Sequence, residues 1–249
     1  MDKRTFLRSL LLGTAGVAAK GLNSPLKAAG VRKKWDGIFR IPELDYSIVS
    51  LEPFMNKEVL NRHFSIYSDI TANFNRTVSE NGLQGKTIHE IFEKISKLPE
   101  SIRFDGGGYF NHKLFWRVIT PRKNTAFSAE LTYMINRSFD SEAGLQTALA
   151  DAANRVSGSG WAWLVSGKDG SLFVTATSGN DNPLMNTSKE RGFPLLCLDT
   201  WDHATAANQY SNTTEYVNAF WNHLNKEVVS KRYVTSGRFF SRSSSLRGA

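Results

Sequence analysis

An aspartate and a histidine four residues apart form the most suggestive pair of side chains in the sequence. Asp199 ends the apolar run 193–199, and His203 follows in the segment DTWDH. A chain that leaves a strand can turn both side chains toward one point, so the carboxylate and the imidazole can bind the same ion. This ligand pair suits iron or manganese, whereas zinc sites and thiolate clusters more often recruit cysteine.

The other histidines show no comparable spacing. His63, His89, His112 and His223 are scattered along the chain, and an isolated histidine is more often a core or surface residue than a ligand. The lone cysteine, Cys197, lies inside an apolar run, which predicts a buried and inert thiol. Spacing alone therefore does not complete a metal site.

Apolar periodicity and turn residues predict the elements that must position these side chains. The predicted helices cover residues 56–76, 87–98, 128–156 (as two helices) and 214–224. The predicted strands are the apolar, partly β-branched runs 161–166, 171–177 and 193–199, and the turn residues 168–170 join the first two as a hairpin. The glycine triplet 106–108 is expected to break the chain before a further helix that carries His112.

These elements predict an α+β protein of two domains. An N-terminal helical hairpin domain is expected over residues 35–123. An α/β domain with a small three-stranded antiparallel sheet follows over residues 124–235. The tail, residues 236–249, is rich in serine and arginine and is expected to be disordered.

The first 29 residues are expected to form a cleavable signal peptide. Lys3, Arg4 and Arg8 precede an apolar run of small residues, 9–19, which is too short for a comfortable membrane span. The segment KRTFLR resembles a twin-arginine export motif with lysine in place of the first arginine, and a plain Sec signal is the alternative. We therefore expect an exported protein, periplasmic or extracellular, without stable membrane insertion.

Charge and composition argue against a nucleic-acid-binding protein and are compatible with a small anionic substrate. The formal net charge is +8, and a moderately basic body can draw a small anion toward a site. Nucleic-acid binding is not expected, because no basic stripe with interleaved aromatic residues appears.

Four motifs along the chain resemble the iron/manganese superoxide dismutase family. They are LEPFMNKEVLNRH (51–63), GGGYFNHKLFW (106–116), GSGWAWL (158–164) and DTWDHA (199–204). They occur in the family's order and extend the resemblance over nearly the whole chain after the signal peptide.

The resemblance implies a ligand set and an activity. His63, His112, Asp199 and His203 would hold one manganese or iron ion per subunit and leave a coordination position open for solvent. The implied reaction converts superoxide to dioxygen and hydrogen peroxide. The alternative reading is a metal-binding homologue with little or no dismutase activity.

The resemblance also implies which residues surround the metal, and this chain departs from the family there. Trp116, Trp161, Trp163 and Trp201 would supply a dry apolar wall. The family's gate tyrosine, eight residues after the first ligand, is replaced by Thr71. Tyr67, halfway between, is a possible substitute.

Two further positions differ from the family pattern. The glutamine that bonds the metal-bound solvent is replaced by Asp181 in the segment NDNPL, although a small shift would bring in Asn180 or Asn182 instead. Asp202 replaces the glutamate that reaches the ligand histidine of the partner subunit. A homodimer is still expected.

Overall fold

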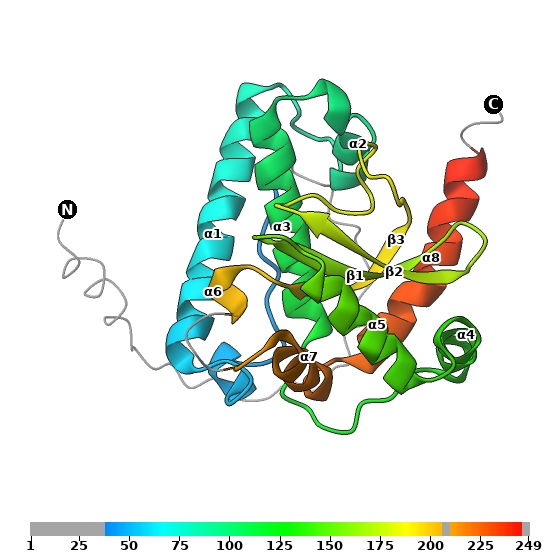
Figure 1. Cartoon of the computed structure of the whole chain (residues 1–249). Helices are drawn as coiled ribbons and strands as arrows, with labels where there is room; N and C mark the ends of the chain where they lie inside the picture. The colour runs from blue at the N-terminus through cyan, green and yellow to red at the C-terminus, as the bar shows by residue number, and fades with distance from the viewer. Residues whose placement is uncertain (1–37, 206–209, 246–249) are drawn as a thin grey trace, which may run out of the picture. The chain divides into compact units, whose positions relative to one another are not determined.

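A computed structural model of the chain describes residues 38–205 and 210–245, and these residues belong to one compact unit (Figure 1). The predicted signal peptide therefore lies outside the described residues. The helices are α1 (Lys57–Glu80), α2 (Ile88–Phe92), α3 (Glu100–Val118), α4 (Ala129–Phe139), α5 (Glu142–Asn154), α6 (Asp202–Thr205), α7 (Thr213–Asn222) and α8 (Lys226–Ser245). Two short 3₁₀ helices cover Ile48–Leu51 and Ile95–Lys97.

The predicted N-terminal hairpin is formed by α1 and α3, which pack side by side (Figure 1). Asn56 caps α1, because its side chain accepts a hydrogen bond from the Val59 N–H at 2.9 Å. Residues four apart share a face of a helix, so His63, Tyr67 and Thr71 lie together on the buried side of α1.

Helix α3 runs through the glycine triplet, so the predicted break at residues 106–108 is wrong. Glycine weakens an isolated helix, but here it allows close approach of other parts of the chain. A Cβ atom on Gly107 would lie 2.0 Å from the backbone oxygen of Asn180, and one on Gly106 would lie 2.9 Å from the ring of Phe74. Tertiary packing therefore outweighs the helix propensity of these residues.

The sheet has three antiparallel strands, as predicted, and their order is β2-β1-β3. Their bounds are Gly160–Ser166 for β1, Leu172–Ser178 for β2 and Phe193–Asp199 for β3. The central strand β1 and strand β3 are buried along their whole length, which explains their continuous apolar sequence. Helix α5 contacts β1 and β2, and α3 and α8 contact β3.

Residues 236–245 were predicted to be disordered, but they belong to α8, which extends to Ser245. Composition alone missed the apolar residues within the serine- and arginine-rich segment. Phe239 packs against Phe193 of β3 with ring centroids 5.2 Å apart. Ser236 is buried and donates a hydrogen bond to Ser166 at the end of β1. The predicted helix 87–98 is also divided, into α2 and a short 3₁₀ helix.

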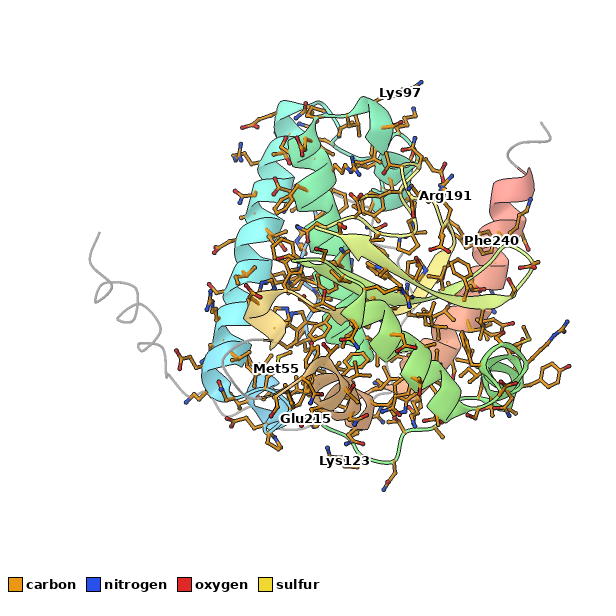
Figure 2. All side chains as sticks on the ribbon, viewed as in Figure 1. Met55, Lys97, Lys123, Arg191, Glu215 and Phe240 are labelled. Carbon is orange, nitrogen blue, oxygen red and sulfur yellow. The ribbon has the colours of Figure 1, made fainter. Side chains whose placement is uncertain are left out.

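Figure 2 shows the side chains that fill the space between these elements. One continuous core joins the helical hairpin to the sheet, with the large rings of Trp116, Trp161 and Trp163 fully buried in it. Cys197 is buried in the same core, as predicted, and forms no disulfide. Among the described residues, no helix combines the length and the apolarity that crossing a bilayer requires.

Candidate metal centre

Four side chains from distant segments bring one ligand atom each to a common point. His63 comes from α1, His112 from α3, Asp199 from the end of β3 and His203 from α6, and their ligand atoms all lie within 4.8 Å of one another. Asp199 Oδ2 is 3.1 Å from His63 Nε2, 3.3 Å from His203 Nε2 and 3.9 Å from His112 Nε2. Metal–ligand bonds near 2.1 Å place neighbouring ligand atoms roughly 3–4 Å apart, so these separations fit one ion.

The same four atoms lack any other partner. The Nε2 atoms of His63, His112 and His203 and the Oδ2 atom of Asp199 are buried without a hydrogen bond in the described chain. Leaving a buried polar atom unpaired costs about 1–3 kcal/mol. A single cation would satisfy all four, and three imidazoles with one carboxylate are a donor set suited to iron or manganese. The residues predicted as ligands therefore fit this metal.

Hydrogen bonds to the opposite side of two ligands orient them. His112 Nδ1 lies 2.8 Å from the Gly108 backbone oxygen. Donation of the Nδ1 proton to this oxygen leaves Nε2 with its lone pair free for a metal. The Trp201 backbone N–H donates to Asp199 Oδ1 at 2.9 Å, which leaves Oδ2 for the metal.

Electrostatics keep the ligands in the protonation state that a metal needs. Burial lowers the pKa of His112 to about 3, and burial also lowers the pKa of His63. Burial alone would raise the pKa of Asp199, but the adjacent imidazoles of His203 and His63 bring it below its ordinary value. The site therefore contains an ionised carboxylate facing neutral His63 and His112 at neutral pH.

Aromatic rings cover the ligands, as predicted for three of the four tryptophans. The centroid distances are 5.0 Å for Trp116 and His63, 5.1 Å for Trp161 and His112, and 5.7 Å for Trp201 and His203. Trp163 packs on Trp161 at 6.1 Å and makes no ring contact with the four ligands. Phe115 adds a further ring, 5.0 Å from His63.

Comparison with known proteins agrees with this geometry. Residues 38–120 match the model of the iron/manganese superoxide dismutase alpha-hairpin domain, and residues 127–232 match the model of the C-terminal domain of the same enzymes. The chain belongs to the iron/manganese superoxide dismutase family. It is 30% identical over 205 residues to superoxide dismutase [Mn] 1 of Leptolyngbya boryana. The matched region covers 80% of this chain and 82% of that protein.

Asp181, expected in place of the family's solvent-binding glutamine, is partly exposed and already paired with another side chain. Its carboxylate forms a two-pronged ion pair with Arg103, with Nε–Oδ1 and Nη2–Oδ2 distances of 2.7 Å and 2.5 Å. The Asp181 side chain is 31% exposed. A guanidinium fork matches a carboxylate, and this partner on α3 occupies both carboxylate oxygens of Asp181.

Asn180, the neighbouring residue, instead enters the core next to the ligands. Its side-chain nitrogen donates to the Phe104 backbone oxygen at 3.1 Å, and its side-chain oxygen accepts from Trp161 Nε1 at 3.4 Å. The same nitrogen lies 2.8 Å from the place where a Cβ atom on Gly108 would stand. The Asn180 amide therefore excludes a side chain at Gly108, the position from which iron-type dismutases supply their glutamine.

Tyr67 lies directly against the metal centre. Its ring stacks on His112 with centroids 5.6 Å apart and an interplanar angle of 11°. The Tyr67 hydroxyl is buried and has no hydrogen-bond partner in the described chain. Thr71, at the family's gate position, directs its hydroxyl back to the Tyr67 backbone oxygen at 2.7 Å. Tyr67 is thus a tyrosine that packs directly on one of the four ligands.

The other predicted residue, Asp202, lies at the start of α6 and is exposed. Next to it, the His203 side chain is 10% exposed. Sequence reasoning did not identify Asn111, whose side chain is fully buried beside His112. It donates to the Asn180 backbone oxygen at 3.1 Å and accepts from Asn182 at 3.2 Å. The signal in the sequence that could have identified Asn111 is its position as a polar residue inside the apolar motif around His112.

Proposed function

We propose that this protein is a superoxide dismutase that converts superoxide to dioxygen and hydrogen peroxide at one manganese or iron ion per chain. The observation that carries the proposal is the convergence of four buried ligand atoms without other partners, from the four positions that the family uses. When bound, the ion supplies the one-electron exchange with superoxide by alternating between the +3 and +2 states.

The chain's own residues bind the ion, orient its ligands and shield them from water. The carboxylate of Asp199 offsets part of the ion's charge, and Gly108 and the Trp201 N–H hold two ligands in position. The tryptophan rings restrict water and lower the local dielectric around the ligands. The Tyr67 hydroxyl is the polar group that can hold a proton near the ligands, and the Asn180 amide contributes hydrogen bonds beside Gly108.

We propose manganese as the preferred metal. The Asn180 amide fills the space beside Gly108, and it comes from the segment in which manganese-type enzymes carry their glutamine. The similarity to a protein named for manganese supports the same choice.

Loading the protein separately with each metal tests the function. We expect the manganese form to accelerate superoxide decay in proportion to bound manganese, and the iron form to be at least about tenfold less active per ion, since the surroundings must tune each metal's potential. Xanthine-oxidase-coupled cytochrome c reduction is a suitable assay. Absence of activity in both fully loaded forms would leave the alternative reading, a metal-binding homologue.

Asn180 should contribute to activity more than Asp181 does. The Asn180→Ala variant loses the amide beside the ligands, and we expect kcat/KM to fall about tenfold or more with metal content retained, the usual scale for a group that supports metal ligands. The matched control Asp181→Asn removes the ion pair with Arg103 in the same loop and should change kcat/KM less than about twofold, because exposed pairs contribute little. A larger loss in the control than in Asn180→Ala would reverse this assignment.

We further propose a homodimer that brings Asp202 of each subunit near the partner's metal centre. The exposed Asp202, the partly exposed His203 side chain and the 47% exposed ring of Phe104, which contacts Trp201, lie together on one surface. We expect a dimer by sedimentation at micromolar concentration, weakened in Asp202→Ala because a hydrogen bond across the interface is lost. A monomeric parent with an unchanged variant would contradict this.

Export also remains a proposal, since residues 1–29 lie outside the described residues. The basic start and the apolar run 9–19 support it. Under the twin-arginine route, Arg4→Lys should retain precursor in the cytoplasm. Normal export of this variant would instead indicate the Sec route.

A further inference from the structure

A second concave site lies away from the metal centre, between α2, α3 and α8. Its cavity has a volume of about 280 Å³, and none of the four metal ligands lines it. Helix α8, which carries Phe240 in Figure 2, forms one wall, and Phe39, from the segment before α1, forms another. The size suits a ligand of roughly one aromatic ring, since drug-sized ligands occupy about 300–1,000 Å³.

The polar lining of this cavity includes four basic side chains, besides Thr87 and Tyr109. Lys113 and Arg117 come from α3, Arg232 from α8 and His89 from α2, whereas no aspartate or glutamate is among the lining residues. None of these four side chains forms an ion pair in the described chain. Lys113 donates only to the Tyr109 hydroxyl, at 3.0 Å. Three cationic side chains, Lys113, Arg117 and Arg232, that converge without a counter-ion are a binding arrangement for an anion.

The surrounding charges also act on one another. Burial lowers the pKa of Arg232 to about 10, and the charge of Arg117 contributes to this decrease. Burial lowers the pKa of His89 as well, and Arg232 contributes again. Arg232 still carries its charge at neutral pH, so its repulsion with Arg117 persists until an anion binds between them. His89 Nδ1 is buried without a hydrogen-bond partner, which leaves a polar atom for a ligand to satisfy.

The rest of the cavity is apolar and aromatic. Phe39, Phe110 and Leu114 are buried residues of the core whose side chains form its lining. Inorganic ions gain nothing from such a surface, whereas a ring or a short hydrocarbon chain is stabilised by leaving water. The lining therefore favours a ligand that has an apolar part next to an anionic group.

We propose that this cavity binds a small amphipathic carboxylate, with its anionic group between Lys113, Arg117 and Arg232 and its apolar part against Phe39 and Phe110. The site is independent of the metal centre and of the proposed dismutase activity. Its occupant is defined by chemistry, a monocarboxylate of about the size of benzoate.

Calorimetric titration of the metal-loaded protein with benzoate tests the proposal. We expect one benzoate per chain with a dissociation constant of about 1 mM or below, the range expected for so few ligand atoms. Benzamide, which has the same shape without the charge, should bind at least about tenfold more weakly. Inorganic phosphate probes the charge alone and should also bind at least about tenfold more weakly, because it cannot use the apolar lining.

Two variants locate the binding site. Arg117→Gln changes an exposed residue and should weaken benzoate binding about tenfold without affecting folding. The matched control Lys231→Gln removes one positive charge from an exposed position of α8 outside the cavity and should leave binding within about twofold. Three results would overturn the proposal. They are no benzoate binding at 10 mM, about tenfold above the expected dissociation constant, equal binding of benzamide and benzoate, and undiminished benzoate binding to Arg117→Gln. Phosphate binding as tight as benzoate would overturn the apolar half of it.

Discussion

Replacing His112 with alanine should remove stoichiometric metal from the purified protein. The ligand is buried, its Nε2 atom has no other partner, and no other described side chain is placed to replace it. We expect less than about 0.1 ion per chain after dialysis, since even groups that only support ligands change metal affinity 10–100-fold. Asp199→Ala should behave the same way. Inductively coupled plasma mass spectrometry measures the metal content.

The loss of metal should also lower thermal stability. A ligand that binds only the folded state at a thousand times its dissociation constant stabilises that state by about 4 kcal/mol, which corresponds to roughly 10 °C in Tm for a chain of this size. Apo parent protein should therefore unfold near the temperature of the His112→Ala variant. Calorimetry on both forms checks this.

The chain contains a closely matched control for this experiment. His223 is another buried histidine whose Nδ1 lies 2.9 Å from a carbonyl oxygen four residues earlier, that of Ala219, just as His112 Nδ1 faces Gly108. His223 lies outside the metal cluster, so His223→Ala should retain a full complement of metal. Parent-like metal in His112→Ala and Asp199→Ala, or equal loss in His223→Ala, would contradict the ligand assignment.

Replacing Gly107 with alanine should destabilise the fold more than any other single methyl addition to α3. The new Cβ would lie 2.0 Å from the Asn180 backbone oxygen, which belongs to backbone and cannot rotate away. Either α3 or the loop after β2 must shift, so we expect a decrease of about 3 kcal/mol or more in the free energy of unfolding. Because Asn180 shifts with that loop, activity per bound ion should fall as well. Urea denaturation measures the first effect.

Gly237→Ala adds the same methyl group but should raise the free energy of unfolding. Gly237 lies within α8, and a Cβ atom there would meet nothing within 4 Å. Alanine favours a helix over glycine, so this variant should gain about 0.5–1 kcal/mol. If Gly107→Ala unfolds at the same urea concentration as the parent, the close approach of α3 to the Asn180 loop is wrong.

Local sequence patterns predicted the elements whose stability is local. The three strands coincide with apolar runs that end within one residue of the observed bounds, because turns punctuate them clearly. The glycine triplet and the tail 236–245 were misread for a shared reason. Both are stabilised by partners distant in sequence, Asn180 for Gly107 and Phe193 for Phe239, which neither propensity nor composition reports.

The residues of the candidate site also differ in how far the sequence alone could predict them. Only Asp199 and His203 are close enough in sequence for spacing to pair them, and His63 and His112 entered through the resemblance to the family. The resemblance to the family places Asp181 where the family has glutamine, but its carboxylate pairs with Arg103, a residue 78 positions away. The Asn180 amide takes the buried place, because a neutral amide bonded to Phe104 and Trp161 costs less to bury than a carboxylate.

The rate of superoxide decay as a function of bound manganese tests the central claim most directly. Samples of the parent protein loaded to graded manganese contents would be mixed with superoxide, and decay would be followed by its ultraviolet absorbance. We predict a catalytic rate that rises linearly with bound manganese, passes through zero for the apoprotein, and reaches its limit at one ion per chain. A rate that does not depend on bound manganese, or that stays at the uncatalysed value in the fully loaded protein, would contradict the proposed manganese-dependent dismutase function.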